Sequence, residues 1–512
     1  MSQAESRQPA PSEEGPKPPA VRAAPIPPAG RSAGWRLLPQ LEKNATLLKW
    51  ARTLPGRLVL VACFTGLFAL TGTKTWPLTG VVLALISVAP KLRRLWLLGA
   101  ALGWIFLSPP LSLSVLRELA AKQGAPGLVS AWPAVVACIL AFSAGYVSLV
   151  RRWPKSVLGR HPVAGLILLV LALLAASGAV GGAASVLLAA AAMVLGRYLW
   201  FFAYSVCAGL SKDTAPFATR LGFLRPFWGF TLVPFGKGSA YLQKVEAADD
   251  EQFAVAQLKG LKLLVWALAL SLVLELLTAI DGSGPGGWLA RLGWHPAPLL
   301  PSYPEALESV LQGRPVAWGL RWLALIVFFL EEVTNVAVFG HLAIATARMA
   351  GFNAFRNTYR PFASTSIAEF YNRFYYYFKE LLVDCFFFPT YFAYFRKSPR
   401  LRLFFATLVS AGLGNFLFHF LRDDAYIFRL GFGRALVAYQ AYALYALILG
   451  VAIGISQARS LARKRKAPTG VRRILAIAGV LTFYCLVSIV DGTDHEHTIA
   501  DYARYLASLF GF

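Results

Sequence analysis

The chain has 512 residues, of which 57% are hydrophobic and 13% are aromatic, and its formal net charge is +25. This composition excludes an ordinary soluble domain and is typical of a protein that crosses a membrane several times. The positive charge is divided among short segments between apolar runs. We therefore expect no nucleic acid partner, and anionic membrane lipids are the expected counter-charge.

The first segment differs from the rest of the chain. Residues 1–34 are rich in Pro and Ala, carry scattered charges and contain no apolar signal-peptide core, which predicts a disordered cytoplasmic tail. Transmembrane helices are expected over 35–224. Apolar runs of about 17–25 residues, the length that spans a bilayer, start near Leu58, Leu95, Leu128, Val163, Ala183, Leu261, Val316, Leu403, Ala435 and Ile474, with 77–90 as a shorter candidate. The sequence thus predicts an all-α polytopic membrane protein with about eleven transmembrane helices.

Basic residues alternate along the chain with these apolar runs. They cluster at 43–57, 91–94, 151–160, 212–225, 348–360, 396–402 and 459–473, whereas the loops at 74–76, 116–127 and 281–315 carry fewer. Basic loops are usually cytoplasmic. We therefore expect a multi-pass protein of the cell (inner or plasma) membrane with its N-terminus inside and its C-terminus outside.

One polar segment interrupts the apolar pattern. Residues 357–389 read NTYRPFASTSIAEFYNRFYYYFKELLVDCFFFP, with charged side chains set among many aromatic ones. Basic clusters on both sides of the segment predict that it enters the membrane and returns on the same side, as re-entrant helices around a central funnel. The alternative is an interfacial amphipathic helix whose Arg373 and Lys379 reach toward the headgroups.

Other polar groups have two interpretations each. Glu331 and Glu332, with Asn335, either line a substrate path or pair with Arg321 or Arg348. The run Arg422, Asp423 and Asp424 is expected to be a solvated loop at the end of a span. The C-terminal DGTDHEHT contains metal-compatible side chains without a recognised spacing, so no metal site is assigned, and ADYARYLASLFGF is expected to lie along the outer surface.

A dense series of motifs surrounds the polar segment. Its members are Gly351-Phe352, Asn357, Pro361, Thr365-Ser366-Ile367, Glu369-Phe370, Arg373, Asp384 and Pro389, followed downstream by ATLVSAGLGNFLFHF. In order and type they resemble the signature region of the membrane-bound O-acyltransferase (MBOAT) family, whose bacterial members include the alginate O-acetylation protein and the D-alanyl transfer protein of teichoic acids. The likeness spans roughly 225–460, which would be the MBOAT-like core. Residues 461–512 would then be a basic loop, a last transmembrane helix and an external amphipathic C-terminus.

The family's histidine positions are altered in this chain. Asn415 stands where the essential histidine of the family is expected, and His419 follows one helical turn later. Tyr375 aligns with the second histidine of the family, and His341 aligns with its upstream aspartate. O-acyl transfer needs a base for the acceptor's proton and a donor for the oxyanion. The resemblance therefore implies that His419 is the base and Asn415 a hydrogen-bonding partner, in one cavity with Asp384 or Glu369.

The resemblance implies an integral-membrane O-acyltransferase. It would move an acyl group from a thioester donor, acyl-CoA or a carrier protein, to a hydroxyl of a glycan, lipid or small lipophilic acceptor, with a possible external partner protein. Expected substrate-binding residues are Asp384, Arg373, Glu369, Asn357 and His341. The alternative is a catalytically silent relative that acts as a substrate-binding, channel or assembly component.

Overall fold

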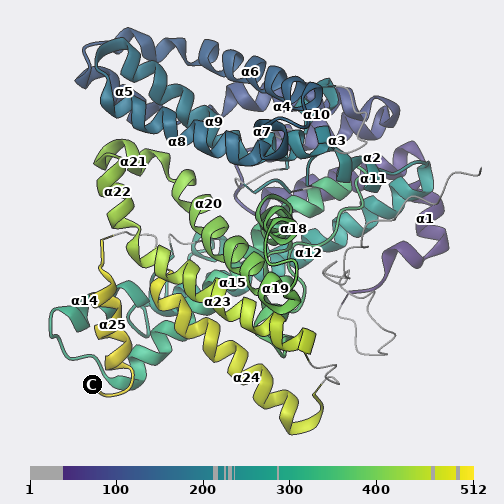
Figure 1. Ribbon diagram of the computed structural model, residues 1–512. Coiled ribbons are helices and arrows are strands. Elements are labelled where there is room, and N and C mark those ends of the chain that lie inside the picture. The colour runs from purple at the N-terminus through teal and green to yellow at the C-terminus, as the bar shows by residue number, and fades with distance from the viewer. Residues whose placement is uncertain are drawn as a thin grey trace, which may run out of the picture. The chain divides into compact units, whose positions relative to one another are not determined.

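The structure is a computed structural model (Figure 1). It describes residues 38–210, 217–223, 226–228, 233–235, 237–284, 287–462, 468–491 and 496–512. The chain divides into two units, Met1–Pro39 and Gln40–Phe512. The predicted tail at 1–34 lies outside the described residues.

The described residues form helices and no strand, as the sequence predicts. The helices before residue 211 are η1 Leu41–Lys43, α1 Ala45–Ala51, α2 Leu54–Ala69, α3 Trp76–Val88, η2 Pro90–Leu92, α4 Arg93–Leu107, α5 Leu113–Lys122, η3 Pro126–Ala131, α6 Trp132–Arg152, α7 Val157–Arg160, α8 Pro162–Ala179 and α9 Gly182–Leu210. Side chains mark their starts: Asn44 accepts the Leu47 N–H at 3.0 Å, and Thr53 accepts the Gly56 N–H at 3.2 Å. Such N-caps satisfy amide groups that have no partner within the helix.

The later helices form the rest of the unit. They are α10 Phe217–Gly222, α11 Gly238–Val245, α12 Asp250–Asp281, α13 Trp288–Arg291, α14 Tyr303–Leu311, α15 Trp318–Met349, η4 Pro361–Ala363, α16 Ile367–Phe374, α17 Tyr376–Leu382, η5 Val383–Phe387, α18 Phe388–Ala393, α19 Pro399–Thr407, η6 Leu408–Gly414, α20 Asn415–Arg422, α21 Asp424–Leu430, α22 Phe432–Ala438, α23 Gln440–Ala462, α24 Gly470–Val487, η7 Ser488–Val490 and α25 Ile499–Ser508. The long helices α12 and α15 pack along each other, as do α8 and α9 (Figure 1). Helix α23 packs on α19 and η6, so it lies beside the segment that leads into α20.

The prediction of a multi-pass membrane protein is confirmed at the level of helix class and apolar spans. Among the described residues, 8 helices are long and apolar enough to cross a membrane, or up to 9 if the bent pair α1 and α2 is one span. The prediction had been about eleven. The difference arises at α2, α3 and α4, which are 16, 13 and 15 residues long, because about 20 residues are needed to cross the hydrocarbon core in a straight helix. Of these, α2 is long enough only together with α1.

The polar segment does not form one long helix. It is broken into α16, α17, η5 and α18, none of which is among the helices long enough to cross. One part of this segment, η5, is π-helical, and so is η6, which lies further along the chain directly before α20. They pack together, and a Cβ added at Gly414 would lie 2.8 Å from a Phe386 ring carbon, so this contact requires a glycine. π-helical turns are frequent at functional sites. Here η6 leads directly into α20, and η5 packs against η6.

Candidate functional site

A cavity of about 470 Å³ lies beside α20. We call it the histidine cavity. It is lined by Val233, Tyr303, Pro304, Leu307, Phe328, Phe329, Glu332, Val333, Asn335, Val336, Phe370, Tyr371, Phe374, Tyr375, Phe378, Asn415, Phe418, His419, Arg422, Tyr442, Tyr445, Leu449, Tyr484, Ser488, Asp491 and Tyr502. Asn415 and His419 are four residues apart on α20 and therefore share a face of the helix. Both line this cavity, as does Tyr375.

Aromatic rings hold the His419 imidazole on three sides. The Tyr442 ring lies 4.5 Å from it between centroids, at an interplanar angle of 37°. Phe378 approaches edge-on, with centroids 5.8 Å apart and an interplanar angle of 90°, and Phe418 lies at 5.2 Å. His419 is half-buried. The imidazole is thus confined by packing while it still borders the cavity, which suits a group that must accept a proton from a bound molecule.

Asn415 is positioned by the same tyrosine. Its side chain is 2% exposed, and its Oδ1 accepts a hydrogen bond from the Tyr442 hydroxyl at 3.2 Å. Because Oδ1 is engaged, the amide NH₂ group is the part of the side chain that can donate to a ligand. Tyr442 therefore contacts both predicted site residues, one through its hydroxyl and the other through its ring.

Two carboxylates and one guanidinium complete the polar lining. Glu332 lies on α15, Asp491 follows η7, and Arg422 ends α20. Arg422 pairs with Asp423 at 3.1 Å, and the Tyr445 hydroxyl donates to Asp491. Burial raises the pKa of the Asp491 carboxyl well above its ordinary value, and the nearby Glu332 carboxylate adds to the rise. The lining therefore contains two acidic side chains, Glu332 and Asp491, together with Arg422 and His419.

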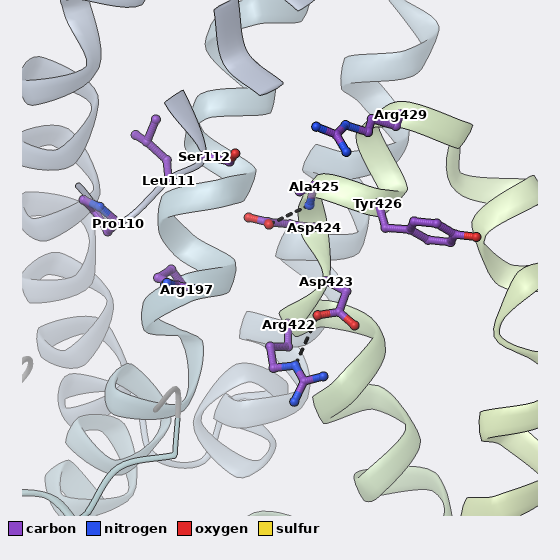
Figure 2. A pocket seen from close by; sticks show the side chains of 10 residues that line it. All are labelled: Pro110, Leu111, Ser112, Arg197, Arg422, Asp423, Asp424, Ala425, Tyr426 and Arg429. Carbon is purple, nitrogen blue, oxygen red and sulfur yellow. Dashed lines mark hydrogen bonds and ion pairs between the residues drawn. The ribbon is translucent and has the colours of Figure 1, made fainter. Parts of the chain in front are cut away.

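A second, polar pocket of about 640 Å³ adjoins α20 and α21; we call it the arginine pocket. Its lining residues are Pro110, Leu111, Ser112, Arg197, Arg422, Asp423, Asp424, Ala425, Tyr426 and Arg429 (Figure 2). Arg197 comes from α9 and is exposed, although that helix is apolar enough to span a membrane. Arg422 lines both this pocket and the histidine cavity. The sequence had suggested a solvated loop here, but Arg422, Asp423 and Asp424 are half-buried and connect two helices.

Asp384 belongs to an ionic cluster away from the histidine cavity. Lys237 Nζ lies 3.0 Å from Asp384 and 2.5 Å from Glu380, and Glu380 also pairs with Lys379. Burial raises the pKa of Asp384, and Lys237 does not fully offset the rise. Burial acts on Glu380 in the same direction, but Lys379 and Lys237 outweigh it and hold the pKa of Glu380 below its ordinary value. The cluster links η5 to the start of α11.

Glu369 and Arg373 pair with each other. Their side chains are 2.6 Å apart, and Glu369 also accepts hydrogen bonds from the Thr365 N–H at 2.7 Å and the Thr365 hydroxyl at 3.0 Å. These contacts fix the start of α16. Neither Glu369 nor Asp384 lines the histidine cavity, in contrast to our expectation, because each is held by partners close to it in sequence or by Lys237.

His341, which belongs to α15, and Asn357, which packs against that helix, are buried and do not line the histidine cavity either. His341 Nδ1 lies 2.6 Å from the Ala337 carbonyl oxygen of its own helix. Asn357 is fully buried, and its Oδ1 accepts the Tyr377 N–H at 3.3 Å. A Cβ at Gly340 would lie 2.5 Å from the Asn357 amide nitrogen, so only glycine allows this approach. These contacts support a role in packing the polar segment onto α15.

The glutamate pair on α15 separates into two environments. Glu332 and Asn335 line the histidine cavity, as one interpretation of the sequence held. Glu331 accepts a hydrogen bond from the Ser283 hydroxyl at 3.2 Å instead. Arg321 and Arg348, which the other interpretation paired with these glutamates, bind backbone carbonyl oxygens instead. Arg321 donates to the carbonyl oxygen of Ser508, and Arg348 donates to the carbonyl oxygen of Ala354.

Several lining residues were not predicted from the sequence to lie in this cavity. Tyr442 and Tyr445 had a signal, because Tyr439, Tyr442 and Tyr445 recur every third residue within an apolar run and so mark one face of a helix. Asp491 stands out in the sequence only as a metal-compatible side chain of DGTDHEHT, and the packing of α24 and η7 brings it to the cavity. Tyr502 likewise places α25 at the cavity, although that segment was expected only to cover the surface.

No group of three or more His, Cys, Asp or Glu side chains that could hold a metal ion occurs among the described residues. Asp494 and His495 lie outside them. In comparisons with known proteins, no family model matches the chain, and a search of curated proteins gives no significant match.

Proposed function

We propose that the chain is an O-acyltransferase of the inner or plasma membrane, which transfers an acyl group from a thioester to a hydroxyl of a glycan, lipid or small lipophilic acceptor. The observation that carries the proposal is the joint placement of His419, Asn415 and Tyr375 on one cavity. Asn415 and Tyr375 align with the two histidines of the MBOAT family that the sequence resembles. His419 follows Asn415 by one helical turn. Membership of that family is part of the proposal.

The arrangement provides each group that the reaction needs. His419 takes the proton of the acceptor hydroxyl as its oxygen bonds to the thioester carbonyl carbon. The Asn415 amide, held by Tyr442, donates to the oxygen on which negative charge develops. The C–S bond then breaks, and the thiolate leaves with the proton from His419. The products are an ester and a free thiol, and the donor thioester is consumed as a co-substrate.

Loss of a base should abolish the transfer while the fold remains. Cells with and without the gene are compared by mass spectrometry of lipids and surface glycans, and the deletion is complemented with wild type or variants. We expect an ester that disappears on deletion and returns with wild type. His419→Ala should reduce its rate of formation by about 10²–10⁴, and Asn415→Ala by less. His161→Ala, which removes an exposed histidine at the start of α8, is the matched control and should behave as wild type.

A catalytically silent substrate-binding protein is the second candidate. It is favoured by Asn415 in the place of the family's histidine and by the engagement of His341 within its own helix. The same experiment separates the two candidates. Full ester formation with His419→Ala at normal abundance would refute His419 as the base, and the absence of any ester that depends on the wild-type gene would favour the silent protein.

A further inference from the structure

The walls of the histidine cavity are unusually aromatic for a site with two carboxylates. Of the 26 residues that line it, 13 are Phe or Tyr. The face of an aromatic ring attracts a cation electrostatically, and the attraction grows when water is excluded. Aromatic rings and carboxylates together are therefore the chemistry that recognises an ammonium group.

The cavity holds two acidic side chains, and the cation that acts on both of them is Arg422. Within the described part of the chain, neither Glu332 nor Asp491 forms a salt bridge, and the nearby Arg422 is already paired with Asp423. A carboxylate taken out of water is costly unless a cation accompanies it. Burial raises the pKa of Asp491 and so disfavours its charged form. A bound cation would restore the charged form.

A further polar group of the cavity is available to a ligand. The Tyr371 hydroxyl is buried and has no hydrogen-bond partner among the described residues. Buried hydroxyls are nearly always satisfied by a protein group, water or ligand. Together with the carboxyl groups of Glu332 on α15 and Asp491 after η7, it indicates a site built for a polar ligand within aromatic walls.

We propose that the histidine cavity binds a molecule with an ammonium group, held by Glu332 and Asp491 against the aromatic walls, and that a hydroxyl of the same molecule faces His419. The inference rests on the proposed function in one respect, since it names the class of acceptor for that site. A neutral polyol would stack on the same rings but would bring no positive charge to the two carboxylates. The charge of the ligand is therefore the property to test.

Choline and 3,3-dimethyl-1-butanol provide the comparison, because they share shape and hydroxyl and differ in the positive charge. Their binding to the full-length protein in nanodiscs, without an acyl donor, is measured by calorimetry, with ethanolamine as the primary ammonium probe. We expect choline, ethanolamine or both to bind at least about tenfold more tightly than the neutral alcohol. Glu332→Gln and Asp491→Asn should each remove most of that preference.

Glu331→Gln is the matched control, because Glu331 is adjacent on α15 but bonds to Ser283 outside the cavity. It should bind as wild type does. Equal binding of charged and neutral probes, or a preference that survives in both carboxamide variants, would overturn the inference. If binding fails while ester formation still depends on His419, only this inference falls; if binding holds while ester formation does not, only the proposed function falls.

Discussion

The role of a single side chain in this protein depends on which cavity or contact the fold gives it. His419 and His341 are both histidines on apolar helices, yet one borders a cavity and the other bonds to its own helix. Glu331 and Glu332 are adjacent and lie in different environments. The environment also sets the charge of a side chain, since burial disfavours the charged form of Asp424.

Asp424 should make stability depend on pH. Burial raises its pKa to about 6, whereas an unfolded Asp titrates near 3.9. Because the folded-state pKa is the higher one, the folded protein binds the extra proton, and this contribution to stability is lost as pH rises from about 4 through 6. Asp424→Asn should therefore raise the apparent Tm above pH 6 and leave it unchanged near pH 4. Melting curves in detergent at several pH values measure this.

Asp501 provides a control of opposite sign. It caps α25, and the hydrogen bonds from the Thr498 N–H and hydroxyl lower its pKa. Asp501→Asn should lower the Tm at neutral pH, with a difference that shrinks as the pH falls below about 4. If Asp424→Asn gave the same profile as Asp501→Asn, the burial effect at Asp424 would be refuted.

At the scale of elements, the two π-helical turns position the site. Segment η6 leads directly into α20, and η5 packs on it through Phe386 and Gly414. The Lys237 cluster fixes η5 from its other side. A change at this contact should therefore disturb both stability and the placement of Asn415 and His419.

Gly414→Ala tests the importance of the π-helical contact. The new methyl group would meet the Phe386 ring at 2.8 Å, and overpacking of this kind costs about 1–3 kcal/mol. Gly433→Ala is the matched control, since Gly433 lies in α22 and an added Cβ has nothing within 4 Å. Thermal unfolding should show a lower Tm for Gly414→Ala and an equal or higher Tm for Gly433→Ala. Equal Tm values for Gly414→Ala and wild type would contradict the steric argument.

The whole molecule is a multi-pass helical membrane protein, and its orientation remains a prediction from its charges. The helices that can cross the bilayer are separated by the basic clusters on which the positive-inside argument rests. The basic loop that follows α23 should be cytoplasmic and the C-terminus external.

Labelling with a membrane-impermeant maleimide measures the orientation. The exposed positions Ser460 and Phe512 are changed one at a time, Ser460→Cys and Phe512→Cys, in a background without other cysteines. In intact cells only the cysteine at 512 should react, and the one at 460 should require permeabilisation. Labelling of position 460 from outside would refute the predicted topology.

The sequence by itself determined the class of the fold and most of the apolar spans. Hydrophobic runs about as long as the bilayer is thick can be recognised locally, and the i, i+4 spacing of Asn415 and His419 put both on one face of α20 without any tertiary information. The sequence did not predict that α3 and α4 are shorter than a membrane span, because the length of an apolar run does not show where its helix ends.

Tertiary structure alone decided which charges meet in the cavity. Asp491, Glu332 and Arg422 come from three different elements, whereas Asp384, Glu369 and Arg373 have nearer partners that hold them elsewhere. Sequence spacing predicts which side chains share a helix face, but not which faces pack together. That choice follows from van der Waals packing between helices within the bilayer and from pairing the remaining charges, and both depend on the whole fold.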